Sequence, residues 1–222
     1  MERDAFLERV RTATATARLP RPDTPRPAIP DVDDDSKSMF TAALLAVNGN
    51  VHSPPTQAEV PELVVGLLTD SGSQRVLAWD DDQLPLPGVI DTVRNAGFEF
   101  VTPDVPSDPV GRINHQAGYG TVDAGITGAA AGFARSGSVV LTAGSGRPRM
   151  ASLIPSLHVA LLPSDALYPS ASAWAADNVA SAQGTSNLVF ITGPSRTGDI
   201  EMHLNLGVHG PRTIHVVLVP VG

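Results

Sequence analysis

Short apolar segments alternate with amphipathic segments along most of this 222-residue chain. The apolar segments are rich in Val, Ile and Leu and are typical of buried strands, whereas the segments between them have the apolar spacing of helices. A helix between two strands lets those strands run parallel, and the helices then cover the faces of the sheet. The alternation therefore predicts an α/β fold with a mainly parallel sheet of roughly six to eight strands and helices on both faces.

The predicted elements follow from this pattern. Strands are expected at residues 50–53, 75–79, 98–101, 121–127, 138–141, 157–162, 188–192 and 213–219. Helices are expected at residues 4–18, 40–47, 62–68, 87–96 and 170–182. Residues 102–120 are too many for a plain connection in a compact domain, so we expect this segment to be functional or mobile.

The first part of the chain differs in composition from the rest. Its helical pattern would bury Phe6, Val10 and Ala17, and five prolines follow between Leu19 and Pro30. Proline lacks the backbone N–H group that a helix requires, so this second segment should be an extended arm. We therefore predict an N-terminal helix and arm over residues 1–37 and an α/β domain over residues 38–222.

Composition excludes several classes of function. The sequence has no cysteine, so it forms no disulfide and holds no iron–sulfur cluster through thiolates. Its net charge is −8 and it has no basic stripe, which argues against nucleic-acid binding. No apolar run is long enough to cross a membrane and no signal peptide is evident, so we expect a soluble, cytoplasmic protein. The six histidines lack metal-ligand spacing, and we expect no metal site.

The stretch from Val189 to Arg212, VFITGPSRTGDIEMHLNLGVHGPR, is the most distinctive in the chain. It predicts a buried parallel strand, a turn at 193–197 and a short helix that ends before Gly207. Backbone N–H groups at the start of such a helix, together with hydroxyl groups and the Arg196 guanidinium, would bind a carboxylate or phosphate. The alternative is an ordinary turn in which a solvated Arg196 pairs with an acid of the following helix.

In a parallel sheet, ligands bind beyond the carboxyl ends of the strands, where we expect the turn 193–197 and the end of the strand 121–127. His209 and Arg212 should lie at the opposite end of the sheet. No catalytic residue is assigned. The predicted ligand-binding residues are Gly193, Ser195, Arg196, Thr197, Asp199, Glu201, Thr127 and Gly128.

Other glycine-rich segments carry weaker signals. The spacing of Gly125, Gly128 and Gly132 differs from the dinucleotide-binding fingerprint, whose first two glycines are two residues apart. The segment 144–147, Gly-Ser-Gly-Arg, is either a second anion-binding loop or the tip of a hairpin. Arginines beside Gly/Pro turns would suit small anionic ligands. These arginines are Arg147, Arg149, Arg196 and Arg212.

Several of these segments together resemble the lactate utilization protein C family, or LUD domain. The matching strings are GPSRT at 193–197, DIE at 199–201, LGVHGP at 206–211 and DAGITGA at 123–129, with a similar strand at 155–163. The resemblance implies a NagB/RpiA/CoA-transferase-like fold. Where the family usually has an acid before Thr-Gly, this chain has Arg135 before Ser-Gly, so no acyl-transfer role passes to that position.

The resemblance implies a component of a bacterial system that oxidises L-lactate to pyruvate together with iron–sulfur partner proteins. In that interpretation this chain carries no cofactor, and the clusters belong only to its partners. Two alternatives stay open: a stand-alone enzyme acting on a phosphorylated or CoA-linked small substrate, and a non-catalytic scaffold that senses an anion. The sequence leaves open whether the chain is itself an enzyme, and it does not indicate an oligomeric state.

Overall fold

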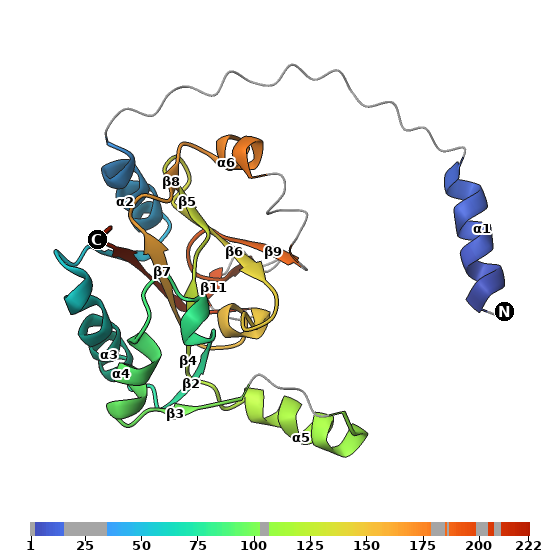
Figure 1. Cartoon of the computed structure of the whole chain (residues 1–222), viewed down its shortest axis with the longest axis horizontal. Helices are drawn as coiled ribbons and strands as arrows, with labels where there is room; N and C mark the ends of the chain where they lie inside the picture. The colour runs from blue at the N-terminus through green and yellow to red at the C-terminus, as the bar shows by residue number, and fades with distance from the viewer. Residues whose placement is uncertain are drawn as a thin grey trace.

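A computed structural model describes residues 3–15, 35–102, 107–178, 185, 187–198, 204–206 and 210–222 (Figure 1). The predicted proline-rich arm from Leu19 to Pro30 lies outside the described residues. Helix α1 spans Arg3–Ala15 and confirms the predicted helix, but none of its residues is buried. Phe6 is 50% exposed and Val10 is 42% exposed, so the prediction that this helix buries them is wrong.

A six-stranded sheet forms the centre of the molecule, with strand order β1-β12-β7-β4-β2-β3 and every pair parallel (Figure 1). This confirms the predicted α/β fold. The two middle strands, β4 and β7, are buried along almost their whole length, as their continuous apolar sequences require. The six strands are β1 (Asn50–His52), β2 (Arg75–Ala78), β3 (Glu99–Phe100), β4 (Ala124–Gly128), β7 (Leu157–Pro163) and β12 (Thr213–Val219).

Different elements cover the two faces of this sheet. On one face, Gly125 of β4, in register with His158 of β7, lies against Ala151 of the short helix η3 (Arg149–Ser152). Helix α2 (Ser36–Ala46) lies on the same face, because a Cβ added at Gly132 would lie 3.1 Å from its Phe40 and 2.6 Å from Leu162 of β7.

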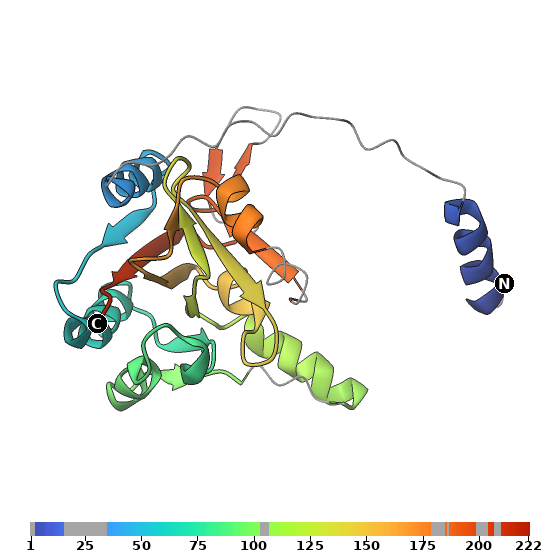
Figure 2. The ribbon, with the colours of Figure 1, turned by 45° about the horizontal axis from the view of Figure 1, so that its top comes forward.

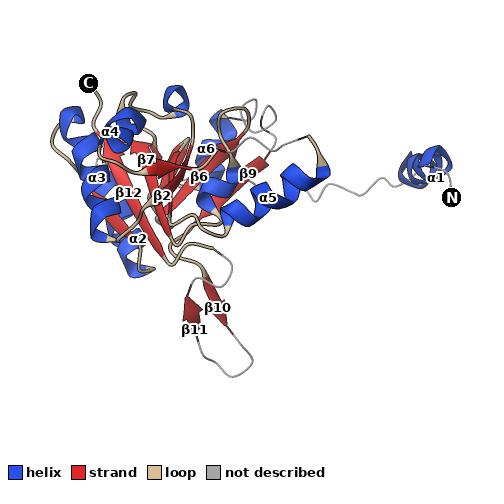
Figure 3. Cartoon of the chain, turned by 90° about the horizontal axis from the view of Figure 1, so that it is seen from below, coloured by secondary structure: helices blue, strands red, loops and turns tan. Residues whose placement is uncertain are grey.

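The opposite face carries two helices that pack against each other, α3 (Val60–Asp70) and α4 (Val89–Asn95) (Figure 3). Leu67 of α3 lines the same hollow as His215 of β12. His215 is in register with Val159 of β7, the neighbour of His158, and neighbouring residues of a strand point to opposite faces.

A second, four-stranded sheet has the order β8-β5-β6-β9 and lies beside the first (Figure 2). We had expected residues 138–141 and 188–192 in the parallel sheet, and that prediction is wrong. Strand β6 pairs antiparallel with both β5 and β9. A tight turn containing Gly137, at φ +62°, joins β5 to β6, and a turn this short permits only antiparallel pairing. The strands are β5 (Ala131–Phe133), β6 (Ser138–Ala143), β8 (Leu167–Tyr168) and β9 (Asn187–Ile191).

The prediction of a helix after the turn 193–197 is also wrong for the part of this segment that the structure describes. Strand β10 (Arg196–Gly198) pairs antiparallel with β11 (Leu204–Leu206), and this hairpin stands apart from the two sheets (Figure 3). The alternation Leu-Asn-Leu in β11 has the period of a strand. Residues 199–203 and 207–209, which include Asp199, Glu201 and His209, lie outside the described residues.

The remaining elements are short. Helix α5 (Pro109–Tyr119) occupies much of the long segment for which we predicted no element, and Asp108 caps it by accepting the N–H of Gly111 at 2.7 Å. Helix α6 covers Ala171–Asp177, and two further short helices are η1 (Gln57–Glu59) and η2 (Asp81–Gln83). Among the described helices, none is long and apolar enough to cross a membrane.

Candidate functional site

The chain leaves strands β2 and β4 toward opposite faces of the parallel sheet. After β2 it enters α4, on the face that α3 covers, whereas after β4 it enters β5 of the second sheet. Because β2 and β4 are neighbours, their carboxyl ends separate and leave a crevice, which is where open α/β sheets bind ligands. A cleft of about 260 Å³ lies there, between the loop from Trp79 to Pro85 and residues Gly128 to Ala130. We call it the switch-point cleft.

Arg147 forms one wall of the switch-point cleft. It follows a tight turn in which Gly146 has φ +67°, and the N–H of Asp80 donates to the carbonyl of Gly146 at 2.8 Å, fixing this turn to the end of β2. The guanidinium Nη1 donates to Thr142 Oγ1 at 2.8 Å, while its Nε is buried and has no partner among the described residues. No described carboxylate forms an ion pair with Arg147, although the exposed Asp82 also lines the cleft.

Trp79 lines the same cleft as Arg147 and lies beside the end of β4. Its side chain is 5% exposed, and its indole N–H has no partner within the described chain. A Cβ at Gly128 would lie 3.2 Å from the indole ring, so a glycine at the end of β4 lets the ring pack closely against the strand. Two residues that line the cleft therefore each carry a buried N–H group without an acceptor among the described residues.

Thr127, which we expected to contact the ligand, is fully buried below the cleft. Its hydroxyl is 2.9 Å from Nε2 of His158 on the neighbouring strand β7. Burial lowers the pKa of His158 to about 3, which keeps the ring neutral at neutral pH. Thr127 therefore holds a core polar pair, and only Gly128 of the two predicted β4 residues lines the cleft.

The turn that begins at Gly193 lies at the opposite end of the parallel sheet. The N–H of Ser195 donates to the carbonyl of Pro211 at 2.8 Å, just before β12 begins, and Arg212 N–H donates to Ser156, just before β7 begins. The prediction that this turn lies at the carboxyl ends of the strands is therefore wrong. The cause is β9, which belongs to the second sheet and delivers the turn to the amino ends.

The predicted site residues consequently separate into two groups. Gly193 and Ser195 are near the amino ends of the strands, whereas Thr127 and Gly128 are near the carboxyl ends. Arg212, expected far from the turn, follows Pro211 and lies at the same end of the sheet as Ser195. For Arg196 and Thr197 the structure describes the backbone as part of β10.

Another hollow, of about 590 Å³, opens at the amino ends of the strands, and we call it the amino-end hollow. Its lining includes Asp70, Asp123, Arg212 and His215. Nδ1 of His215 is 2.8 Å from Nε2 of His52. Burial lowers the pKa of both rings, and the neighbouring His52 contributes to lowering the pKa of His215 to about 4. Two carboxylates accompany the exposed Arg212 here, whereas one, Asp82, accompanies Arg147 in the switch-point cleft, so this hollow is the weaker anion site.

Sequence reasoning had named Arg147 as part of a possible anion loop, but it had missed Trp79. An aromatic residue at the end of an apolar strand, followed by the run Asp80-Asp81-Asp82, was the available signal. Within the described residues, no group of three or more histidine or acidic side chains is placed to hold a metal ion.

Comparisons with known proteins identify the family. The family model named LUD domain matches residues 38–219. The lactate utilization protein C of Halalkalibacterium halodurans is 30% identical over 97% of this chain and 97% of its own length. That of Shouchella clausii is 30% identical over 94% of this chain and 93% of its own length.

A crystal structure of a DUF162 family protein from Deinococcus radiodurans has a similar fold. It superposes with a TM-score of 0.62 and 21% sequence identity, over 86% of this chain and 99% of the other chain. Its fold and the family-model match agree with the resemblance carried by the GPSRT and LGVHGP strings. The chain belongs to the LUD domain family.

Proposed function

We propose that this chain is a component of a cytoplasmic lactate-utilisation system and binds a small carboxylate, such as lactate or pyruvate, in the switch-point cleft. The names of its relatives, lactate utilization protein C, support the first part of the proposal. One observation carries the second part: the cleft contains a partly buried guanidinium, that of Arg147, with which no described carboxylate forms an ion pair.

A carboxylate is well suited to this position. Arginine presents parallel N–H donors that match the two oxygens of a carboxylate. Arg149 lines the adjoining hollow and adds a second positive charge nearby. Since a hydrogen bond to a charged group contributes about 1.5–3 kcal/mol, loss of the Arg147 contact should weaken binding roughly ten- to a hundred-fold.

Calorimetric titration with lactate and with pyruvate tests the site. Arg147→Met removes the charge but keeps an unbranched side chain, and it should weaken both ligands. Arg135→Met is the matched control, because Arg135 is an exposed residue of the turn between β5 and β6. Equal affinities for wild type and Arg147→Met, with both proteins folded by their melting curves, would reject the site.

The turn 193–197 is a second candidate, with Gly193, Ser195, Arg196, Thr197 and the acids Asp199 and Glu201. Arg196→Met in the same titration separates the two locations: loss of affinity only in this variant would favour the amino-end turn. Coenzyme A and inorganic phosphate belong in the ligand panel as well. Their tight binding would favour the alternative of a stand-alone enzyme acting on CoA-linked or phosphorylated substrates.

Electron transfer in this proposal rests with iron–sulfur partner proteins, because this sequence has no cysteine. Affinity purification at native expression should recover such partners, and the reconstituted assembly should oxidise L-lactate to pyruvate. Steady lactate-dependent dye reduction by the isolated chain would contradict this division of roles. Binding of lactate without any partner or lactate-dependent activity would instead favour the anion-sensing scaffold.

A further inference from the structure

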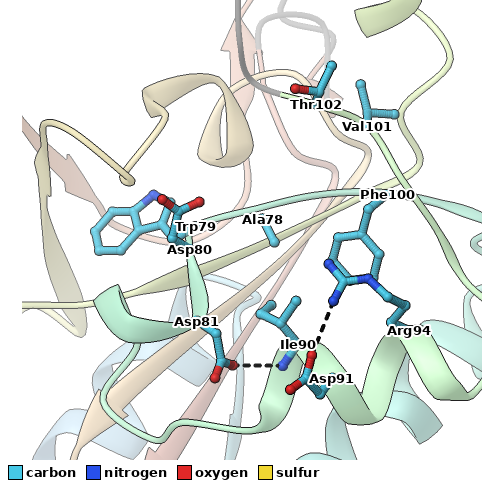
Figure 4. A pocket seen from close by; sticks show the side chains of 10 residues that line it. All are labelled: Ala78, Trp79, Asp80, Asp81, Ile90, Asp91, Arg94, Phe100, Val101 and Thr102. Carbon is cyan, nitrogen blue, oxygen red and sulfur yellow. Dashed lines mark hydrogen bonds and ion pairs between the residues drawn. The ribbon is translucent and has the colours of Figure 1, made fainter.

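A second hollow adjoins the switch-point cleft, and Trp79 lines both. It has a volume of about 360 Å³ and lies between the carboxyl ends of β2 and β3 and helix α4 (Figure 4). The switch-point cleft alone falls below the range of about 300–1,000 Å³ that small-molecule sites occupy, whereas the two hollows together fall inside it. The available space therefore exceeds what the carboxylate group alone would use.

The walls of this second hollow are mixed, with apolar side chains beside three aspartates and an arginine. Ala78, Ile90, Phe100 and Val101 supply side chains from the two strand ends and from α4 (Figure 4). Ala78 and Ile90 are buried, while Phe100 and Val101 are partly exposed and can meet a ligand. An uncharged extension of a ligand would gain free energy by covering these carbon atoms.

Most charges around the hollow already have partners. Asp81 accepts the N–H groups of Gly88 at 2.6 Å and Ile90 at 3.0 Å. Arg94 pairs with Asp91 at 3.1 Å, and its guanidinium lies 5.0 Å from the centre of the Phe100 ring (Figure 4). These groups therefore offer little attraction to a second charged group on a ligand.

Asp80 lies next to the turn that carries Arg147. It lines the second hollow, and its carboxylate faces the backbone of Gly146, where an added Cβ would be 2.7 Å from Oδ2. Arg147, one residue further on, lines the switch-point cleft. The switch-point cleft, with Arg147, therefore favours a negative group, and the second hollow, with Asp80, disfavours it.

We infer that the preferred ligand is a monocarboxylate with an uncharged apolar or aromatic extension, its carboxylate on Arg147 and its extension in the hollow beside Phe100. The inference rests on the proposed function, because it uses the same carboxylate site. It specifies the ligand class: a single negative charge with a tail, in preference to a polyphosphate or a dicarboxylate.

Calorimetry with two ligands that differ only in the extension tests this inference. The probes are L-lactate and L-3-phenyllactate, which share the 2-hydroxycarboxylate group. Burial of a phenyl group should make phenyllactate bind wild type roughly ten- to a hundred-fold more tightly than lactate. Similar affinities of wild type for the two acids would overturn the inference.

Two variants locate the extension. Phe100→Ala removes the aromatic wall, and Thr102→Trp fills the hollow from an exposed position at its rim, so its folding does not depend on a core change. Each should bring the phenyllactate-to-lactate affinity ratio close to one while leaving lactate binding unchanged within about two-fold. An unchanged ratio in folded Thr102→Trp would also overturn the inference.

Arg147→Met distinguishes this failure from failure of the proposed function. It should weaken both acids equally and preserve their ratio, since it acts only on the shared carboxylate. If Arg147→Met leaves lactate affinity unchanged, the proposed carboxylate site is wrong and the inference falls with it. If Arg147→Met weakens both acids but the two hollow variants keep the wild-type ratio, only the extension has been misplaced.

Discussion

The hydrogen bond between Thr127 and His158 is a polar contact inside an otherwise apolar sheet. Both side chains are fully buried, and Nδ1 of His158 has no partner in the described part of the chain. Protonation would add a charge in a region without solvent, which is why burial lowers the pKa of His158 to about 3. This residue therefore links the stability of the fold to pH.

Stability should decrease in acid because of His158. Its unfolded-state pKa is about 6.5, so below that pH the unfolded chain binds a proton that the folded chain rejects. The stabilisation is fully present above about pH 6.5 and is lost at about 1.4 kcal/mol per pH unit as the pH falls toward the folded pKa. Urea unfolding at about pH 7.5 and pH 5 should therefore show a loss of roughly 2 kcal/mol from this residue.

The double variant Thr127→Val, His158→Leu provides the comparison. Replacing both partners with apolar groups of similar size removes the titrating ring without leaving one partner unpaired. It should lose about 2 kcal/mol less than wild type over the same pH interval, and its affinity for lactate should not change. A weaker affinity for lactate would return Thr127 to the ligand site that the sequence had suggested.

At single residues, the sequence indicated chemistry better than location. Arg147 stood out because a cation follows a Gly-Ser-Gly turn, and the structure puts it at the switch-point cleft. Thr127 was misjudged because the partner of its hydroxyl, His158, is 31 residues away on another strand. A local pattern cannot show which way a hydroxyl at a strand end turns.

The loop from β2 to α4 shapes the cleft, and Asp81 fixes it. Its carboxylate binds the N–H groups of Gly88 and Ile90 at the start of α4. Asp81→Ala should lower the free energy of unfolding by about 1–2 kcal/mol, which is typical for the loss of a helix cap. Asp82→Ala, at the exposed neighbouring position, should change it by less than about 0.5 kcal/mol. Equal effects of the two variants in urea unfolding would contradict this assignment.

Gly125 controls how closely η3 packs on the central sheet. A Cβ at this position would lie 1.7 Å from the carbonyl oxygen of Ala151, so backbone must move. Gly125→Ala should destabilise the protein by about 1–3 kcal/mol or more.

Gly66→Ala is the matched control, because an added Cβ within α3 meets no atom within 4 Å. It should stabilise the protein by about 0.5–1 kcal/mol through helix propensity. Thermal melts of both variants test the pair, and a stabilising Gly125→Ala would show that η3 is not tightly packed.

The parallel sheet could be predicted from local sequence, because its longer strands are mostly apolar runs and turn residues separate its strands from the helices. All six of its strands coincide with predicted ones. The membership of β6 and β9 could not be predicted, since apolar strands of either sheet look alike and pairing depends on turns and distant partners. Helix α5 was predictable in retrospect from Asp108-Pro109, a cap followed by a favourable first-turn proline.

The hairpin of β10 and β11 shows a different limit. The acids after Thr197 matched the start of a helix, and Gly207 matched its end. In the prediction this match outweighed the strand alternation at Leu204 to Leu206. A separate error, the assignment of β9 to the parallel sheet, put the predicted anion site at the wrong end of that sheet. Location thus depended on sheet membership, which the local pattern does not determine.

For the whole molecule, α1 contributes no buried residue and the LUD domain match begins at residue 38. Deletion of residues 1–34 should therefore leave the free energy of unfolding within about 0.5 kcal/mol of the full chain. Lactate affinity should also be unchanged. A large drop in the unfolding midpoint in urea would show that the N-terminal segment packs on the domain, against the predicted boundary.

The order of strands in the parallel sheet also has a consequence for biosynthesis. Strand β12 (Thr213–Val219) lies between β1 and β7, and its register joins Asn50 to His215. While the chain emerges from the ribosome, β1 lacks β12, its neighbour in the described sheet, and one edge of β7 stays unpaired until residue 219 is outside. An unpaired strand edge is a template for association with other chains. The parallel sheet can therefore close only after nearly all of the domain has been translated.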